Sequence, residues 1–560
     1  MARLFNQFAK RKYYSLDGVW DIKFDPKNIG LQENWHKQIP IGAEKTLVPS
    51  CFNMELGNFY YEGFVWYFKK FTSESNNIKI EFGGISGEAK VYLDGKLIAE
   101  HYGEFTKFNF VSSEFPKGEH LLCVKCDNIS NNEDTIPQNH VDWYHYGGII
   151  RPISVFEFEK TCINDINISY TLDEKLENAN LKLFVELKNF STETISDTVK
   201  IFINDELIAE KNIEYFKSLK VDFDIELNNI KLWDIHKGNL YNIRFETNTD
   251  DICEKIGFRK IEARDQKIYL NNKEITIKGV NRHDEHADWG FAVPHALQKR
   301  DMQIIKNMNC NAIRCSHYPQ SDFFLDLCDS EGILIWEEIP MWGIKATTIV
   351  NELFSKRAFK MTEEMMKTHI NHPSIIIWGQ HNECQTDTVE FYNFTKKQNE
   401  LMRSIDNTRL ITFASNISLT DICMEFSDII SVNKYIGWYQ MPMSQWEDYI
   451  KELNTKLKNE NAFNKPVIMS EFGAGGIAGH RTFENQRWTE NYQTEYLEYT
   501  LNLFKKTPNI VGTYIWQYCD IRTASENELG RPRSFNNKGL VDEYRRPKEA
   551  YHFVKEFYGK

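Results

Sequence analysis

Eight apolar runs of strand length, separated by longer amphipathic segments, dominate the chain after about residue 264. The segments between them carry apolar residues at helical spacing, as in residues 300–308. A strand, helix, strand order that repeats over about 300 residues fits a closed (β/α)8 barrel better than an open sheet. The eight runs are residues 275–277, 312–314, 333–336, 375–378, 410–413, 429–432, 467–469 and 511–516.

The first part of the chain has a different pattern. Up to about residue 159, short alternating runs are separated by turn residues, and Asp94-Gly95 between two such runs indicates a β-hairpin. A second β-rich stretch, residues 160–263, has about the length of an immunoglobulin-like sandwich. We therefore predict two β-sandwiches, over residues 1–159 and 160–263, followed by a (β/α)8 TIM barrel over residues 264–560.

Composition excludes several functional classes. The chain has 560 residues, a formal net charge of −13 and no long run of Lys or Arg, so nucleic acid and anionic membranes are not expected partners. It has no apolar stretch of signal-peptide length and no 18-residue apolar run, which predicts a soluble, cytoplasmic protein. Its 11 cysteines are scattered singly, as reduced thiols are.

Two short motifs have alternative interpretations. Cys123 and Cys126 form a C-x-x-C pair that zinc or redox sites use, but no second pair lies nearby and the segment alternates like a strand. Residues 473–476 are glycine-rich and follow a strand, yet they lack the G-x-G-x-x-G pattern of dinucleotide binding. Neither metal nor nucleotide binding is predicted from these motifs.

Two glutamates close the fourth and seventh apolar runs, Glu383 and Glu471. In a parallel barrel the strand ends meet at one face, where catalytic groups gather. Either glutamate alone is more simply explained as the first turn of a helix or as a solvated residue. Together they suggest cleavage of a glycosidic bond, which needs two carboxyl groups in different protonation states. Apolar neighbours would keep one of them a proton donor.

The residues around these strand ends resemble glycoside hydrolase family 2 nearly from end to end. The motifs that carry the resemblance are 16–20 (LDGVW), 257–259 (GFR), 281–286 (NRHDEH), 314–319 (RCSHYP), 382–383 (NE) and 470–473 (SEFG). The family resemblance implies a jelly roll for the first sandwich, and a barrel that carries catalysis. It also implies a retaining double displacement, with Glu471 as nucleophile, Glu383 as acid and then base, and carboxyls about 5 Å apart.

The resemblance also implies binding roles. Asn382 would bind the 2-hydroxyl of the sugar, and His317 lies in one of the shared motifs. The segment that holds His283, Asp284, Glu285 and His286 would form a wall of the site. Some β-galactosidases of the family use magnesium, but no further carboxylate cluster supports a metal here, so we expect no metal and no cofactor.

Residues 531–540 resemble the Asn-x-Lys element with which the β-glucuronidases of this family hold the substrate carboxylate. Asn536 and Lys538 would then bind the uronic acid, because an ammonium and an amide donor suit a carboxylate better than a hydroxymethyl group. Arg531 or Arg533 would serve as an active-site arginine. The resemblance further implies substrate contacts by Asp142 from the first sandwich, Tyr435 beside the nucleophile, Tyr439 at the sugar and Trp516 beneath it. A surface acid and core aromatics are the alternative interpretations.

The expected function is a cofactor-free, retaining exo-β-glucuronidase that acts on a small-molecule or oligosaccharide β-D-glucuronide. The alternatives are a β-galacturonidase or a neutral-sugar β-glycosidase of the same family, which would share both glutamates, and a non-catalytic sugar-binding protein. The stretch 341–357 lacks the long loop that covers the aglycone in some β-glucuronidases of this family, so the resemblance implies a more open entrance and larger aglycones. Family members are often tetramers, so the resemblance implies a homo-oligomer.

Overall fold

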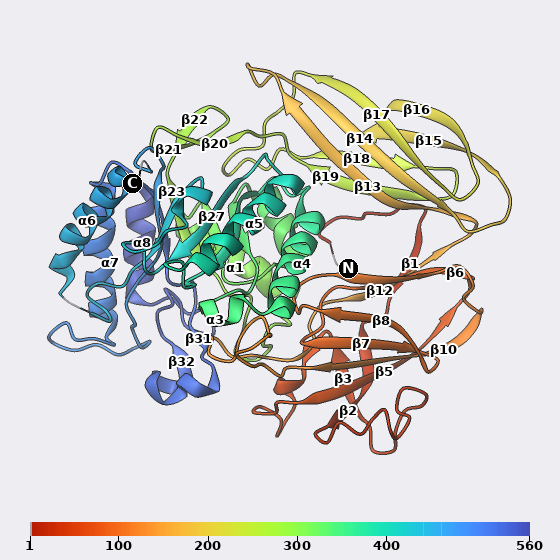
Figure 1. Ribbon diagram of the computed structural model, residues 1–560, viewed down its shortest axis with the longest axis horizontal. Helices are drawn as coiled ribbons and strands as arrows, with labels where there is room; N and C mark the ends of the chain where they lie inside the picture. The colour runs from red at the N-terminus through yellow and green to blue at the C-terminus, as the bar shows by residue number, and fades with distance from the viewer. Residues whose placement is uncertain (1–2, 441, 461) are drawn as a thin grey trace.

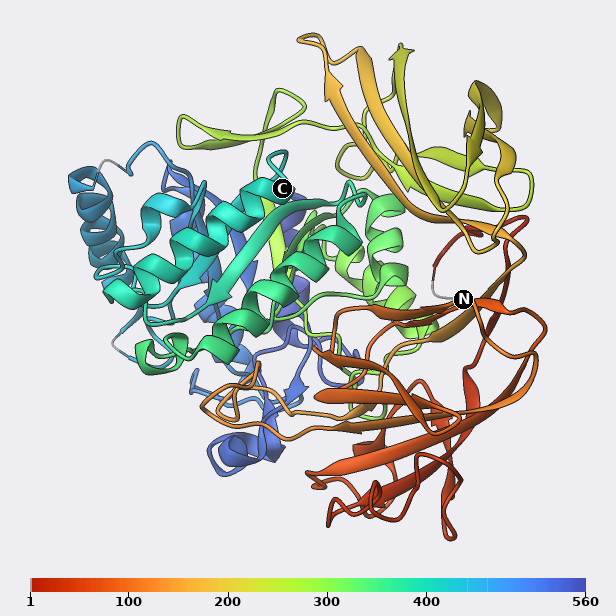
Figure 2. The ribbon, with the colours of Figure 1, turned by 45° about the vertical axis from the view of Figure 1, so that its right-hand side comes forward.

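The computed structural model describes residues 3–440, 442–460 and 462–560. Two groups of antiparallel β-sheets and one closed parallel barrel make up this part of the chain. The barrel occupies one side of the molecule in Figures 1 and 2, and the two β-rich regions lie on the other side. The predicted fold class, β-sandwiches followed by a TIM barrel, is confirmed.

The N-terminal region is a two-layer β-sandwich. Alternating apolar side chains such as Val65, Ile80 and Val124 face each other between the layers and are fully buried. Its four-stranded sheet has the order β1 (Lys12–Ser15), β12 (Ile153–Phe158), β6 (Asn77–Phe82), β9 (Phe108–Ser112). Its six-stranded sheet has the order β3 (Glu44–Val48), β2 (Gly18–Asp25), β5 (Phe64–Ser73), β10 (Gly118–Asp127), β7 (Glu88–Leu93), β8 (Lys96–Tyr102). The short β4 (Ser50–Cys51) and β11 (Gly148–Ile149) also pair, and the 3-10 turn η1 (Phe52–Met54) follows β4.

Local sequence signals explain two features of this sandwich. Leu93 pairs with Lys96, so Asp94 and Gly95 form a two-residue turn. Both turn residues have positive φ, +48° and +81°, which is the backbone that Asp-Gly favours, and the predicted hairpin is confirmed. The C-x-x-C cysteines lie on β10 as free thiols in separate apolar clusters, so the strand interpretation is confirmed.

The second region is a smaller sandwich of long strands. A three-stranded sheet, β13 (Thr161–Leu172), β14 (Asn178–Asn189) and β17 (Ser218–Asn228), packs against a four-stranded one. The latter has the order β16 (Glu206–Tyr215), β15 (Ile195–Ile203), β18 (Tyr241–Glu246), β19 (Asp251–Ile256). A small sheet of β20 (Ile261–Arg264), β21 (Lys267–Leu270) and β22 (Lys273–Ile275) leads into the barrel. We keep residues 1–159, 160–263 and 264–560 as the proposed domain boundaries.

Eight parallel strands close the barrel in chain order. They are β23 (Ile277–Asn281), β24 (Ala312–Cys315), β25 (Leu334–Glu338), β26 (Ile375–Asn382), β27 (Leu410–Ser415), β28 (Ile430–Asn433), β29 (Val467–Phe472) and β30 (Ile510–Ile515). Seven of them begin within one residue of the predicted runs. The first differs, because residue 275 ends β22 and the barrel strand begins at Ile277. The periodicity of so short a run does not show where one strand ends and the next begins.

Helices cover the outside of the barrel. They are α1 (His295–Asn307), α2 (Asp322–Glu331), α3 (Ala346–Ile349), α4 (Glu352–His369), α5 (Val389–Ile405), α6 (Trp446–Asn459), α7 (Glu490–Lys505) and α8 (Glu549–Gly559). Four helices have an N-terminal cap, in which a side chain accepts a hydrogen bond from a backbone N–H of the first turn. The caps of α2, α4, α5 and α7 are Ser321, Asn351, Thr388 and Thr489. In the described residues, no helix combines the length and the apolar character needed to cross a membrane.

The loops after β27, β28 and β30 contain further short elements. These are the 3-10 turns η2 (Met424–Phe426), η3 (Met443–Gln445), η4 (Ser525–Gly530) and η5 (Pro532–Ser534), and the strand pair β31 (Ile521–Arg522) and β32 (Phe535–Asn536). The segment after β30 contacts the first sandwich directly. The N–H of Tyr144 donates to the carbonyl of Arg522 at 2.9 Å, and the Arg531 guanidinium binds Asp142. The first sandwich therefore contributes side chains at the mouth of the barrel.

Candidate active site

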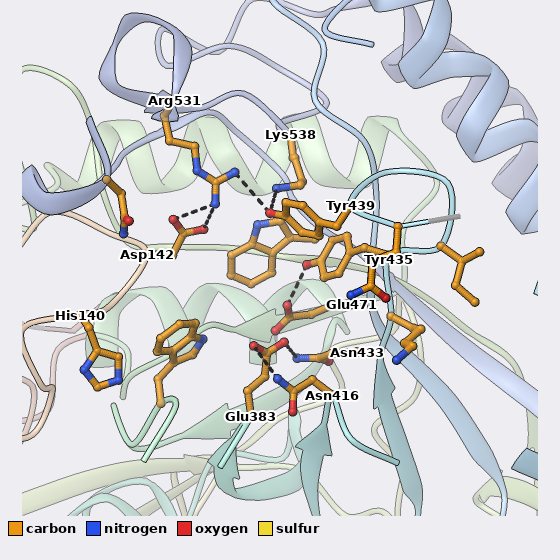
Figure 3. Close-up of a pocket in the computed structure, with 16 residues that line it drawn as sticks. His140, Asp142, Glu383, Asn416, Asn433, Tyr435, Tyr439, Glu471, Arg531 and Lys538 are labelled. Atoms are coloured by element: carbon orange, nitrogen blue, oxygen red, sulfur yellow. Dashed lines mark hydrogen bonds and ion pairs between the residues drawn. The ribbon is translucent and has the colours of Figure 1, made fainter. Parts of the chain in front are cut away.

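A cavity of about 490 Å³ lies where the barrel strands end. Parallel strands present their carboxyl ends to one face, so residues far apart in sequence converge there. Its walls come from the loops after five barrel strands and from the first sandwich (Figure 3). The lining residues are His140, Asp142, Trp342, Glu383, Asn416, Asn433, Lys434, Tyr435, Ile436, Tyr439, Gln440, Glu471, Trp516, Asn527, Arg531 and Lys538.

Glu383 directly follows β26 and has a φ of +52°, a left-handed conformation that glutamate rarely adopts. Its carboxyl oxygens accept hydrogen bonds from the amides of Asn433 at 2.9 Å and Asn416 at 3.4 Å. Burial, and then the nearby Glu471, raise the pKa of Glu383 to about 8. Glu383 is therefore a protonated acid at neutral pH and can donate a proton to a ligand.

Glu471 lies near the end of β29 and is only 3% exposed. Arg314 Nη1 binds one of its carboxylate oxygens at 2.7 Å, and the hydroxyl of Tyr435 donates to the other at 2.8 Å. Figure 3 shows the two glutamate side chains next to each other on the floor of the cavity. The two carboxyl groups thus differ in environment: one faces amides, and the other faces a guanidinium and a phenol.

Arg314 connects the groups behind the cavity floor. Its fully buried guanidinium binds Glu338 at 2.8 and 3.1 Å in addition to Glu471. Arg314 also donates to Asn382 Oδ1 at 2.7 Å, and Asn433 Nδ2 donates to the same oxygen at 3.0 Å. Asn382 Nδ2 is buried and has no partner among the described residues. A buried N–H group without a hydrogen-bond partner destabilises the folded protein, so this donor is suited to bind a ligand hydroxyl.

His317 is fixed beside the same network. Its Nδ1 lies 2.7 Å from Glu338, and its Nε2 lies 3.9 Å from Glu471. Burial and the positive charge of Arg314 lower the pKa of His317 to about 3, so the ring is neutral. The ring stacks on Trp516 with centroids 5.2 Å apart. His317 therefore supports the indole that lines the cavity.

Lys538 lies at the other end of the cavity and is only 2% exposed. Its ammonium donates to the hydroxyl of Tyr439 at 2.7 Å and lies 4.8 to 5.7 Å from the rings of Tyr435, Trp438 and Tyr439. Among the described residues, no carboxylate lies within ion-pair distance of it. Burial lowers the pKa of Lys538. An ammonium in such a place is costly unless a ligand brings a negative charge.

Asp142 reaches this end of the cavity from the first sandwich. Arg531 Nη2 binds both of its oxygens, at 2.7 and 2.9 Å, and Asn536 Nδ2 donates to it at 2.9 Å. Arg531 therefore lines the cavity, whereas Arg533 binds Glu543 at 2.8 Å. With Asp142 neutralised by Arg531, the charge on Lys538 remains unbalanced.

The structure brings the proposed site residues together around one cavity. Both glutamates, Asp142, Tyr435, Tyr439, Trp516, Arg531 and Lys538 line it. His317, Asn382 and Asn536 do not line it, but they contact Glu338, Arg314 and Asp142 respectively.

Sequence reasoning did not select several lining residues, among them Asn433, Asn416 and Trp342. Asn433 ends β28 and Asn416 follows β27, so the rule that barrel sites form at strand ends would have found both. Trp342 lies four residues beyond β25, and its bridge to Asn382 is a tertiary contact without a local signal.

Metal-ligating residue types also cluster outside the cavity. Within the described residues, atoms of Asp326, Asp329 and His372 lie close enough to share an ion. They already have protein partners, since His372 lies 2.6 Å from Asp329 and Arg3 binds Asp326 at 2.9 Å. In the motif 281–286, Asp284 pairs with Arg282 at 2.9 Å and Glu285 accepts from Tyr146 at 3.0 Å. Each of these four carboxylates thus has a protein partner on at least one oxygen.

Comparison with known proteins identifies relatives along the whole chain. Residues 261–560 match the model "Glycosyl hydrolases family 2, TIM barrel domain", and residues 161–259 match "Glycosyl hydrolases family 2". A β-glucuronidase of Streptococcus agalactiae is 27% identical, with 98% of this chain and 96% of the relative covered.

Solved structures are similar as well. A family 2 β-galacturonidase of Eisenbergiella tayi bound to galacturonate has a TM-score of 0.91 and 33% identity, covering 100% of this chain and 99% of that one. A Ruminococcus gnavus β-glucuronidase has a TM-score of 0.86 and 26% identity, covering 99% of each chain.

Proposed function

Because this chain belongs to glycosyl hydrolase family 2 and is a glycoside hydrolase, we propose that it is a retaining exo-β-glucuronidase. In the first step Glu471 would attack the anomeric carbon while Glu383 gives its proton to the departing glycosidic oxygen. In the second step Glu383 would take a proton from water, which attacks the glycosyl-enzyme and releases the sugar and Glu471. The raised pKa of Glu383 and the guanidinium beside Glu471 support this division of roles.

The observation that supports a uronic acid as the terminal sugar of the substrate is the buried ammonium of Lys538. It is almost fully buried, its one hydrogen-bond partner among the described residues is the Tyr439 hydroxyl, and it lies beside an aspartate that Arg531 already neutralises. A sugar carboxylate would supply the missing negative charge, whereas a hydroxymethyl group would leave the ammonium unpaired. The unpartnered amide of Asn382 supports a contact with a sugar hydroxyl near the anomeric carbon.

Replacing Lys538 with methionine tests this assignment. We expect kcat/KM for 4-nitrophenyl β-D-glucuronide to fall by about 10²-fold or more, because a buried charge pair is lost. The 4-nitrophenyl galactoside and glucoside serve as neutral references, and their kcat/KM should change much less. Steady-state kinetics at neutral pH on this panel measures the effect.

Stability provides the control for the same variant. A buried ammonium without a counter-charge destabilises the fold, so Lys538→Met should unfold at the same or a higher temperature than the parent protein. A variant that is folded and still prefers the glucuronide would overturn the carboxylate assignment.

A β-galacturonidase is the second candidate function. The observation in its favour is the galacturonidase structure, which has higher identity and a higher TM-score to this chain than the Ruminococcus gnavus glucuronidase. Glucuronate and galacturonate differ only at C4, and both have the carboxylate that Lys538 would bind. Adding the matched 4-nitrophenyl galacturonide to the panel separates the two, since the preferred epimer will have the larger kcat/KM.

The proposed acid role of Glu383 predicts a pH dependence. Glu383 must carry a proton to act on the leaving group, and its pKa is raised to about 8, so kcat/KM should be sustained at neutral pH and fall as pH rises through about 8. Profiles between about pH 5.5 and pH 9.5 for a glycoside with an alkyl leaving group would show this alkaline limb. In Glu383→Gln the limb should disappear. A limb centred below about pH 6 in the parent protein would contradict the assignment.

A further inference from the structure

Three cationic side chains line the cavity, and the proposed glycone contacts do not use one of them, Lys434. Lys434 directly follows the end of β28, and its backbone N–H donates to the carbonyl of Glu471 at 2.9 Å. Within residues 3–440, 442–460 and 462–560, its ammonium makes no ion pair and donates no hydrogen bond. The ammonium lies over the ring of Tyr449, 5.4 Å from the ring centroid. Burial lowers the pKa of Lys434, as expected for a charge without a partner.

Lys434 lies on the leaving-group side of the cavity. Glu383 is the ionisable group that would raise the pKa of Lys434 when it loses its proton, whereas Tyr439, Arg531 and Asp142 act on the pKa of Lys538. The residue before it, Asn433, donates to Glu383 at 2.9 Å. In the proposed mechanism Glu383 faces the glycosidic oxygen, so groups clustered around it face the aglycone. The two lysines thus mark different ends of the substrate.

Glu383 does not neutralise Lys434 in the resting enzyme. With a pKa raised to about 8, Glu383 is uncharged at neutral pH. The other two acids that line the cavity already have partners, because Asp142 binds Arg531 and Glu471 binds Arg314. None of the acids that line the cavity therefore pairs with Lys434, and its half-buried ammonium is open to solvent or to an anionic group on a ligand.

The surroundings of Lys434 suit a sugar-sized aglycone. The amide of Asn416 and the carboxamide of Gln440 line the same cavity. The rings of Trp342 and His140 also line the cavity, with centroids 5.9 Å apart, and offer flat ring faces. Polar donors next to an aromatic surface are what the hydroxyls and the C–H face of a pyranose require.

We propose that Lys434 binds an anionic group on the aglycone. This enzyme would then act on glycosides whose aglycone carries a negative charge, such as oligosaccharides whose second residue has a carboxylate or a sulfate. The proposal rests on the proposed function, because it takes Glu383 as the residue that faces the leaving group. Lys434 would then select the aglycone as Lys538 selects the terminal sugar, and a substrate with an anion at both positions would neutralise both lysines.

Matched aryl glycosides test the proposal. The glycone is the one preferred in the 4-nitrophenyl panel, and the aglycones are 4-(carboxymethyl)phenol and its neutral amide, 4-(carbamoylmethyl)phenol. A 4-(sulfomethyl)phenyl glycoside, which carries a sulfonate in place of the carboxylate, represents a sulfated aglycone. The measured quantity is the ratio of kcat/KM for the anionic glycoside to that for the neutral one. We expect about a tenfold preference for the anion, which falls toward one in Lys434→Gln and at high salt.

Two further variants sharpen the readout. Lys434→Arg keeps the charge and should preserve the preference. Lys451→Gln removes an exposed lysine of α6, outside the cavity, and should leave the ratio as in the parent protein. A preference confined to the carboxylate arm would identify a second uronate as the natural aglycone, and one confined to the sulfonate arm would identify a sulfated sugar.

A ratio near one in the parent protein, or a ratio that Lys434→Gln does not change, would overturn the proposal. If Lys434 acted only on Glu383, Lys434→Gln would shift the alkaline limb equally for both aglycones and leave their ratio unchanged, which is also a negative result. Failure of the uronidase assignment is a separate outcome, because it appears as a neutral-sugar preference in the panel. The aglycone ratio can then be measured on that neutral glycone.

Discussion

Glu471→Gln is expected to lower kcat for every β-glycoside by at least about 10⁴-fold, because the amide cannot form the glycosyl-enzyme. The change preserves the shape of the side chain: the amide oxygen can still accept from Arg314, and the Tyr435 hydroxyl, which now donates to the second carboxylate oxygen, can instead accept from the amide nitrogen. The loss should appear in kcat for good and poor leaving groups alike, since both require the nucleophile. Steady-state kinetics with 4-nitrophenyl and alkyl glycosides measures it.

Two controls accompany this variant. Glu498→Gln makes the same chemical change at an exposed position of α7 and should keep the parent rate. In the parent protein, a 2-deoxy-2-fluoro glycosyl fluoride should leave a covalent sugar on the peptide that contains Glu471, because the fluorine slows hydrolysis of the intermediate more than its formation. An adduct on another residue, or more than about 1% residual activity in Glu471→Gln, would rule out this nucleophile.

Glu383→Ala is expected to show a loss that depends on the leaving group. A general acid contributes about 10²- to 10⁴-fold, and an alkyl glycoside should lose the larger factor because its oxygen cannot depart without a proton. The 4-nitrophenolate of an aryl glycoside departs without protonation. The first step should therefore remain fast for this substrate, and the glycosyl-enzyme should accumulate. Pre-steady-state kinetics would show the accumulation as a burst of nitrophenol.

Azide provides the diagnostic for the same variant. It attacks the glycosyl-enzyme without a general base and fits the space that the side chain leaves, so it should restore turnover and yield a β-glycosyl azide. A β product also reports two inversions, and hence retention. Equal losses for both leaving groups, without an azide product, would show that Glu383 is not the acid and base.

The barrel and its two glutamates could be predicted from the sequence because their signals are local. An apolar run such as 375–378 marks a buried strand within a few residues, and the position of Glu383 at its end follows from the same few residues. Parallel strands share one carboxyl face whatever the loops do, so strand order alone brought Glu383 and Glu471 to the same end of the barrel.

The pairing of charges was decided by the tertiary structure. Sequence gave equal weight to Arg531 and Arg533, but the loop conformation turns Arg531 toward Asp142, 389 positions earlier in the chain, and Arg533 toward Glu543. Lys434 carried no signal as a binding residue, because its lack of a partner depends on every element that surrounds it. The residue pattern thus determined the fold and the two reactive carboxyls, whereas ion pairing and desolvation, which depend on distances between remote segments, determined which charges remain free for a substrate.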